Sequence, residues 1–277
     1  MRGHMGKTSN SDMVAAFFAA AKKGQTTVVR ACLRAGVAVD VRMPAKLKKE
    51  EDDPGRVTAL MIAAGKGHRP VVALLLKEGA DPNAVNEYKW SVLQYAVRAN
   101  RTSVVALLLK AGADPNLRLY GRDFVLRDAA APYVDLKITK MLIAHGADVN
   151  AVDNRGGTAL QVAAYRGNLA VAKLLLKAGA DINEGNCYHG GPLPCAILHG
   201  QTKMAAFLLK RGADRRLQAE ALGLAARLGM LQTVRRLLAA GFDPNSRAWH
   251  GQTPLHHARN GKHRTVVAAL LAAGGHD

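Results

Sequence analysis

Two cysteines and two histidines lie close together in the sequence and are the residues most suited to metal chemistry. They are Cys187, His189, Cys195 and His199. Thiolate and imidazole are ligands that zinc accepts, and Cys195 and His199 are four residues apart, so one face of a helix could present both. However, Cys195 falls at a position that is normally packed in the repeat described below, and Cys187 lies several turns of chain away. We therefore expect no metal site here, and keep a zinc site as the alternative.

A second pair of chemically capable residues, His256 and His257, follows Thr253-Pro254-Leu255. Neither histidine has a convincing nucleophile or carboxylate partner in the sequence. The chain also lacks the motifs of a nucleophile elbow, a phosphate-binding loop, a zinc protease and a dinucleotide fold. We expect a non-enzymatic protein that needs no cofactor.

The charge of the chain points to binding rather than catalysis. Lysine and arginine exceed aspartate and glutamate by 18, which favours an acidic partner. Part of this excess has a structural interpretation, because Lys77, Lys110, Lys177 and Lys210 recur where the last turn of a helix is expected and complement the helix dipole there. No nucleic-acid motif accompanies the charge, so nucleic acid or another polyanion is the alternative partner, recognised by its salt dependence.

The elements that position these residues repeat with a nearly fixed period. Gly-Ala-Asp recurs so that Asp81 and Asp114 are 33 residues apart, Asp114 and Asp148 34, and Asp148 and Asp181 33. Such a period indicates a stack of small units rather than one globular core.

One unit, residues 153–183, shows the expected local structure. It opens with a turn rich in glycine and asparagine, and Thr158 follows where a helix N-cap is expected. A short alanine-rich helix then ends at Gly167, and a second helix closes at Gly179. Each unit is thus a turn plus two short antiparallel helices, and about eight units are present.

This pattern resembles the ankyrin repeat over nearly the whole chain. The resemblance rests on Thr253-Pro254-Leu255-His256, the paired alanines at 63–64 and 163–164, the leucine triplets at 74–76, 107–109 and 174–176, and the Gly-Ala-Asp-x-Asn closings. It implies an all-α repeat solenoid, in which helix-turn-helix units with β-hairpin or loop fingers stack into one curved array. We expect the repeats over residues 12–277, preceded by a disordered or tag-derived tail at 1–11.

The resemblance further implies a protein interaction scaffold, whose binding surface is a concave face formed by the hairpin tips and the exposed side of the first helices. Aromatic and arginine side chains dominate protein interfaces. The partner-binding residues predicted on this basis are Tyr88, Trp90, Arg98, Arg155, Tyr165, Arg166, Tyr188 and Trp249. For Trp90, packing against a neighbouring hairpin is the alternative. The favoured partner is an acidic protein or peptide, bound by a monomeric chain.

Three irregularities interrupt the period. An enlarged loop spans 41–57, with adjacent basic and acidic blocks. In the fourth unit Pro132 is expected to interrupt and kink the first helix, leaving a second helix at 139–144. In the seventh unit, residues 215–218 run almost directly into the helix and replace the hairpin.

Cysteine content and hydropathy bear on the compartment. Three cysteines in 277 residues do not make a disulfide framework. No apolar stretch is long enough to span a bilayer, and none resembles a signal peptide. We expect a cytoplasmic protein without membrane contact, with the nucleus as the alternative if the source is eukaryotic.

Overall fold

The computed structural model describes residues 10–44, 56–117, 124–185, 191–213, 215–247 and 251–277, without the side chains of 215–218. Within these ranges the regular structure is helical, in sixteen helices that form eight consecutive pairs. Two isolated antiparallel bridges, Val85 with Ser91 and Val152 with Thr158, close two of the loops that precede a helix pair. The loops that precede a helix pair are called fingers below and are numbered by that pair. The third finger thus contains the Val85–Ser91 bridge and the fifth finger the Val152–Thr158 bridge. The predicted all-α repeat architecture is confirmed.

The chain divides into two compact units. The first unit holds residues 1–129 and 133–148, and the second holds 130–132 and 149–277. The helices of the first unit are α1 (Asn10–Lys23), α2 (Thr26–Arg34), α3 (Ala59–Lys66), α4 (Arg69–Lys77), α5 (Val92–Arg98), α6 (Thr102–Lys110), α7 (Val125–Ala129) and α8 (Leu136–Ala144). Those of the second unit are α9 (Ala159–Arg166), α10 (Leu169–Lys177), α11 (Pro192–Leu198), α12 (Thr202–Lys210), α13 (Arg215–Arg227), α14 (Leu231–Ala239), α15 (Pro254–Asn260) and α16 (Arg264–Ala272).

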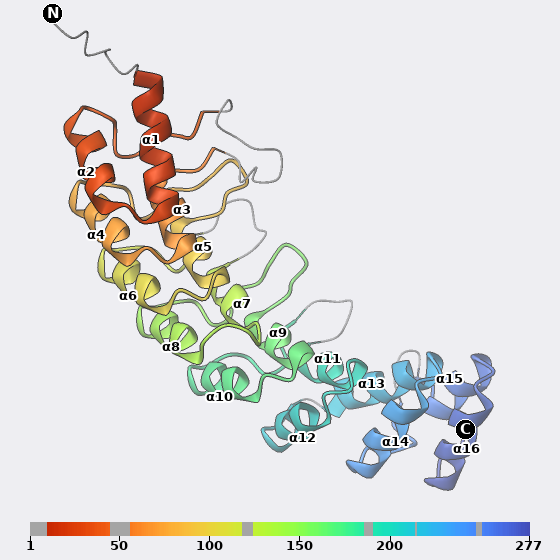
Figure 1. Cartoon of the computed structure of the whole chain (residues 1–277). Coiled ribbons are helices and arrows are strands. Elements are labelled where there is room, and N and C mark those ends of the chain that lie inside the picture. The colour runs from red at the N-terminus through yellow and green to blue at the C-terminus, as the bar shows by residue number, and fades with distance from the viewer. Residues whose placement is uncertain (1–9, 45–55, 118–123, 186–190, 214, 248–250) are drawn as a thin grey trace, which may run out of the picture. The chain divides into compact units, whose positions relative to one another are not determined.

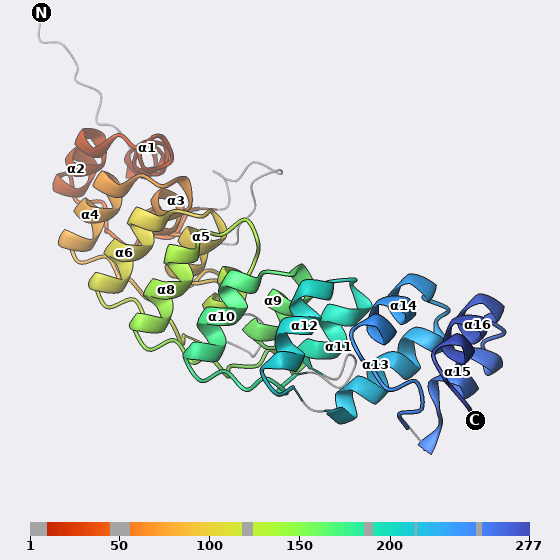
Figure 2. The same ribbon diagram turned by 90° about the horizontal axis from the view of Figure 1, so that it is seen from below.

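In the first unit the helices form two rows (Figure 1). The odd-numbered helices pack on one another in sequence order, and so do the even-numbered helices. The fingers project from the odd-numbered row (Figures 1 and 2). Consequently a finger and the exposed side of the odd-numbered helix that follows it lie on the same side of the unit.

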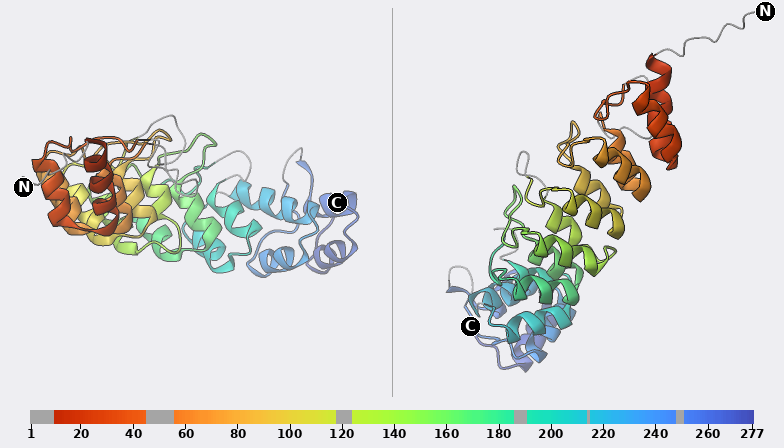
Figure 3. Two further views of the ribbon diagram at one scale, coloured as in Figure 1. Left: turned by 45° about the horizontal axis from the view of Figure 1, so that its top comes forward. Right: turned by 90° about the vertical axis from the view of Figure 1, so that its left-hand side faces the viewer.

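The second unit repeats this arrangement. Its odd-numbered helices α9, α11, α13 and α15 pack in order, and α14 packs on α16 in the other row (Figure 3). The core of both units is built from leucines at repeat spacing. In the odd-numbered helices these are Leu60, Leu93, Leu126, Leu160, Leu193, Leu222 and Leu255, all essentially inaccessible to solvent. Burial of each such side chain contributes roughly 1.5–3 kcal/mol, so each of these repeats contributes to the apolar core of its own unit.

Helix starts follow the caps expected from the sequence. The side chains of Ser91 and Thr158 accept hydrogen bonds from the backbone N–H three residues on. In turn, the side chains of Gln94 and Gln161 accept hydrogen bonds from the backbone N–H of Ser91 and Thr158. These are complete capping boxes. At the other end of α9, Gly167 has φ 69° and ends the helix in the left-handed region, as predicted.

Asparagine side chains join successive repeats at the Gly-Ala-Asp-x-Asn closings. Asn116 Nδ2 donates to Gly146 O at 2.7 Å, while its Oδ1 accepts from Asp148 N at 2.7 Å. The same two bonds join Asn83 to Gly112 and Asp114, and join Asn150 to Gly179 and Asp181. The repeated motif therefore stabilises the stack, since each asparagine forms hydrogen bonds with a backbone carbonyl and a backbone N–H of the next repeat.

Three expectations about boundaries need adjustment. Helix α7 ends at Ala129, before Pro132, so the proline lies beyond the helix instead of kinking it. The second helix of that repeat begins at Leu136 rather than 139, because Asp135 caps it by accepting from Lys137 N. Helix α1 begins at Asn10, inside the predicted tail, while residues 1–9 lie outside the described residues.

The other two irregularities can be located in the structure. Helix α13 is continuous from Arg215, so the seventh pair begins as helix where other pairs have a finger. Of the enlarged loop at 41–57, residues 45–55 lie outside the described residues. Its two ends meet through a hydrogen bond from Met43 N to Val57 O of 2.9 Å.

Candidate interaction surface

The third finger holds Trp90 in a fixed position next to helix α5. Asn86 Oδ1 accepts from Trp90 N at 2.8 Å, and Asn86 N donates to Trp90 O at 3.0 Å. Asn86 Nδ2 donates to the hydroxyl of Tyr95 on α5 at 2.9 Å. Burial raises the pKa of Tyr95, and the hydrogen bond from Asn86 opposes that rise. Asn86 is itself buried, so the finger is tied to its helix by a side chain that solvent reaches poorly.

The indole of Trp90 carries an arginine on its face. The Arg98 guanidinium lies 4.3 Å from the ring centroid, and the Tyr95 ring meets the indole edge-on at 5.9 Å. Arg98 Nη1 also lies 3.4 Å from Oδ1 of Asp128 on α7, whose side chain is only 9% exposed. Trp90 is half-buried as a result and packs on its own repeat's helix, whereas the sequence alternative placed it against a neighbouring hairpin. Tyr88 at the finger tip is 59% exposed.

The residues Tyr88, Trp90, Tyr95 and Arg98 are called the Trp90 cluster below. It offers an exposed phenol, a half-buried indole and a guanidinium that stacks on the indole while facing a carboxylate. These contacts fix the orientation of the Trp90 and Tyr95 rings.

A smaller group lies on α9 and α11 in the second unit. The Tyr165 ring meets His199 with centroids 4.1 Å apart, and the Arg166 guanidinium lies 4.8 Å from the Tyr165 centroid. Tyr165 is 39% exposed. His199 Nδ1 is 2.9 Å from Cys195 O. Tyr165, Arg166 and His199 are called the Tyr165 cluster.

Of the remaining predicted binding residues, only Arg155 is among those that the structure describes. Arg155 is exposed in the fifth finger, where Asp153 Oδ1 accepts from its backbone N–H at 2.8 Å. Tyr188 and Trp249 lie outside the described residues. The eight residues therefore remain predictions as a binding set, although the structure brings Trp90 and Arg98 together, and likewise Tyr165 and Arg166.

Sequence reasoning missed a cavity between the second and third fingers. The cavity measures about 360 Å³ and is lined by Arg42, Arg56, Val85, Asn86, Glu87 and Lys89. A signal existed in the repeat register, since Arg56 and Lys89 each stand two residues before the helix cap, where the fifth and eighth fingers have glycine.

Of the residues considered for metal binding, the structure describes Cys195, which is buried, and His199, which contacts Tyr165 and the Cys195 carbonyl. Burial raises the pKa of the Cys195 thiol to about 11, so this side chain stays neutral. Cys187 and His189 lie outside the described residues. In the part of the chain that is described, no group of three or more His, Cys, Asp or Glu side chains is placed to hold a metal ion.

The other chemically capable residues also serve the fold. His257 is buried, and its pKa is lowered by burial and by the nearby charges of His256 and Arg227. His256 Nε2 faces Asn260 Nδ2 at 2.8 Å. The lysine series has the predicted place, since Lys77, Lys110, Lys177 and Lys210 each end an even-numbered helix.

The fold and its projecting fingers define a class, the helix-pair repeat proteins whose units stack into a solenoid. Family models for ankyrin repeats match most of the chain, as "Ankyrin repeats (3 copies)" over residues 17–118 and 126–219 and "Ankyrin repeats (many copies)" over 224–271. The chain belongs to the ankyrin-repeat family. Repeats of this family are generally non-enzymatic modules for binding other proteins.

A solved structure supports the assignment. The chain is similar to an ankyrin repeat domain from Acinetobacter baumannii AYE, with 31% identity and a TM-score of 0.51. The similarity covers 78% of this chain and 98% of that domain. No curated protein matches the sequence. Among the described helices, none combines the length and apolar character that crossing a bilayer requires.

Proposed function

We propose that this protein is a non-enzymatic adaptor that binds an acidic protein or peptide through its fingers and the exposed side of its odd-numbered helices. The observation that carries the proposal is the Trp90 cluster, in which Arg98 lies 4.3 Å over the indole and is oriented by Asp128. Tryptophan, tyrosine and arginine provide most of the free energy in protein interfaces. The net charge of +18 supports an acidic partner.

The mechanism is the display of preformed contacts. Capping boxes and asparagine bonds between repeats fix the fingers, so that binding orders few additional groups. We propose that the chain acts as a monomer in the cytoplasm, as its low cysteine content suggests.

The same charge supports one alternative, a polyanion such as nucleic acid. Binding of that kind weakens steeply as salt rises and discriminates little among acidic polymers. A salt titration against DNA and RNA separates the two functions, since the adaptor proposal expects no binding to either near physiological ionic strength.

The test of the adaptor proposal is affinity capture from the native lysate. The wild-type chain is compared with the variant Trp90→Ala/Arg155→Ala/Arg166→Ala, and a Lys77→Gln/Lys110→Gln variant of even-numbered helices serves as the control. We expect a partner that the wild type and the control retain and that the triple variant loses. Identical partner lists for all three proteins would overturn the proposed surface.

A further inference from the structure

Two neighbouring fingers carry a cation where other fingers carry glycine. Two residues before the helix cap, the backbone is left-handed at Gly156, with φ 75°, and at Gly251, with φ 71°. The equivalent residues of the second and third fingers are Arg56, with φ 41°, and Lys89, with φ 66°. In these four fingers the backbone therefore has a positive φ at this position whichever residue occupies it.

This backbone region is unfavourable for residues that have a Cβ atom, and glycine enters it freely. Arg56 and Lys89 thus cost folding free energy that a glycine would not cost. Residues held in such conformations are concentrated at functional sites such as ligand-binding sites, where the function of the side chain offsets the strain. What Arg56 and Lys89 have in common is the cavity that both of them line.

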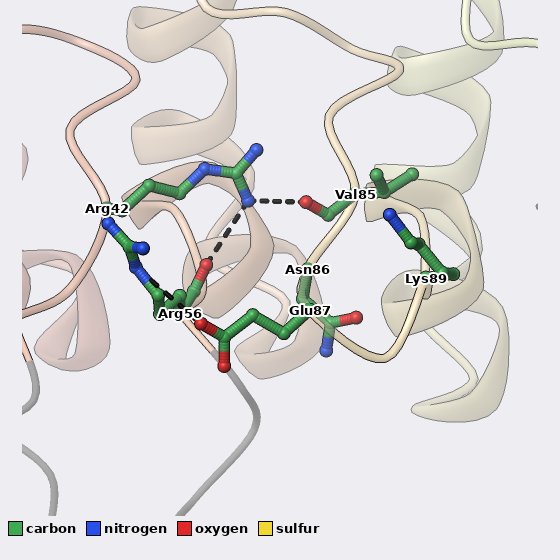
Figure 4. Close-up of a pocket in the computed structure, with 6 residues that line it drawn as sticks. All are labelled: Arg42, Arg56, Val85, Asn86, Glu87 and Lys89. Carbon is green, nitrogen blue, oxygen red and sulfur yellow. Dashed lines mark hydrogen bonds and ion pairs between the residues drawn. The ribbon is translucent and has the colours of Figure 1, made fainter.

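The cavity, called the finger pocket, is held together by Arg42 (Figure 4). Arg42 Nη1 donates to Arg56 O at 3.2 Å and also to Val85 O. One guanidinium therefore joins the second finger to the third. Both acceptors are backbone carbonyls, so these bonds fix the position of Arg42 without neutralising its charge.

The lining of the finger pocket has three cations and one carboxylate. Arg56 Nε lies 3.7 Å from Glu87 Oε1, and both side chains are well exposed, at 62% and 49% (Figure 4). An exposed ion pair at this distance is weak and exchanges readily with other ions. Glu87 therefore marks a position that a carboxylate can take beside Arg56, and an incoming carboxylate can replace it.

The finger pocket is an open depression of limited size. A volume of about 360 Å³ is near the lower end of the range of roughly 300–1,000 Å³ for ligand sites, which suits side chains of a short extended segment. The Glu87 carboxylate already lies beside Arg56, which favours a carboxylate as the incoming group.

We propose that the finger pocket binds a carboxylate side chain of an acidic peptide segment, using Arg56 and Lys89 as the contacting cations and Arg42 as the residue that joins their two fingers. This inference rests on the proposed adaptor function and names the part of the surface that reads acidic residues. The Trp90 cluster contributes apolar contacts from the same third finger.

The test uses fluorescein-labelled hexaglutamate as the probe and fluorescence anisotropy as the measurement, at physiological ionic strength. The variant Arg56→Gly/Lys89→Gly removes two charges and installs the residue that other fingers use, so the fold is retained. The control Lys77→Gln/Lys110→Gln removes two charges from even-numbered helices. We expect roughly tenfold weaker binding for the glycine variant and less than about twofold weaker binding for the control.

A second pair of variants tests whether Glu87 occupies the site. Glu87→Gln is expected to strengthen hexaglutamate binding by about threefold, whereas Glu78→Gln, which removes an exposed carboxylate at the end of α4, is expected to leave it unchanged. Equal strengthening by both variants would indicate general attraction and would overturn the pocket.

The remaining outcomes separate this inference from the adaptor function. Equal loss of binding in the glycine variant and its lysine control, or no binding of hexaglutamate to the wild type, overturns the finger pocket. The adaptor function is judged independently by the partner captured from the lysate. Tighter binding of a single-stranded oligothymidine than of hexaglutamate also overturns the pocket as a carboxylate site, and favours a polyanion instead.

Discussion

The Trp90 cluster and the Tyr165 cluster use the same residue types but differ in how firmly these are held. In the first, Arg98 stacks on an indole and faces Asp128, while Asn86 binds both the finger backbone and the Tyr95 hydroxyl. In the second, Arg166 lies over the tyrosine next to it in the sequence, and the aromatic neighbour is His199. If both clusters contact a partner, we expect the Trp90 cluster to contribute more, because the residues behind it already orient its side chains.

Truncation of the central ring of each cluster is expected to give the largest difference in partner binding between the two clusters. We expect Trp90→Ala to weaken binding of the captured partner by about 2 kcal/mol, roughly thirtyfold, and Tyr165→Ala by about 1 kcal/mol. Titration calorimetry with the purified partner measures both. A larger effect for Tyr165→Ala would reverse the ranking of the two clusters.

Substitution of Asp128, which faces Arg98, tests whether this carboxylate orients the arginine or contacts the partner itself. Asp128 is nearly buried, so Asp128→Asn is expected to lower the unfolding free energy by about 1–2 kcal/mol and to weaken partner binding less than Trp90→Ala does. Chemical denaturation and calorimetry report the two effects. Glu184→Gln, which changes an exposed carboxylate of the second unit, serves as a control in which neither quantity changes.

The helix caps provide a comparison in which the two units are expected to behave alike. Ser91 and Thr158 form the same capping box, so replacing either with alanine is expected to cost about 1 kcal/mol of unfolding free energy. Urea denaturation of the two variants checks this. A cost confined to one of the two variants would mean that these boxes are not equivalent.

Substitutions at the left-handed finger position are expected to change the unfolding free energy least. Introducing glycine in the first unit and removing it in the second are expected to change it in opposite directions. Lys89→Gly is expected to raise the unfolding free energy by about 0.5–1 kcal/mol, because glycine relieves the strain at φ 66°. The reverse change, Gly156→Lys, is expected to lower it by about 1 kcal/mol. Thermal unfolding of both variants against the wild type supplies the comparison, and a loss of stability in Lys89→Gly would show that this lysine is not strained.

The sequence was sufficient for the repeated parts of the fold, because each repeat states the same local signals again. The cap at Thr158, the left-handed end at Gly167 and the lysines that end the even-numbered helices all follow from spacing and intrinsic preference. The sequence correctly predicts that the helix is interrupted near Pro132. It does not predict where, since the helix stops at Ala129 instead of bending at the proline.

The candidate site was less predictable, because its important contacts join residues that are far apart in the sequence. Residue type alone suggested Trp90 and Arg98, but the pairing of Arg98 with Asp128 spans 30 residues. The link from Arg42 to Val85 spans 43. Contacts of that length depend on how neighbouring repeats pack, which periodicity does not specify in atomic detail.

Hydrogen exchange of the first unit with and without the captured partner tests whether the partner binds at the Trp90 cluster. We expect the partner to slow exchange in the third finger and in α5, residues 84–98, and to leave exchange in α4 and α6 of the other row unchanged. Protection of α4 and α6 with none in residues 84–98 would contradict it, because the partner would then bind the surface opposite the Trp90 cluster.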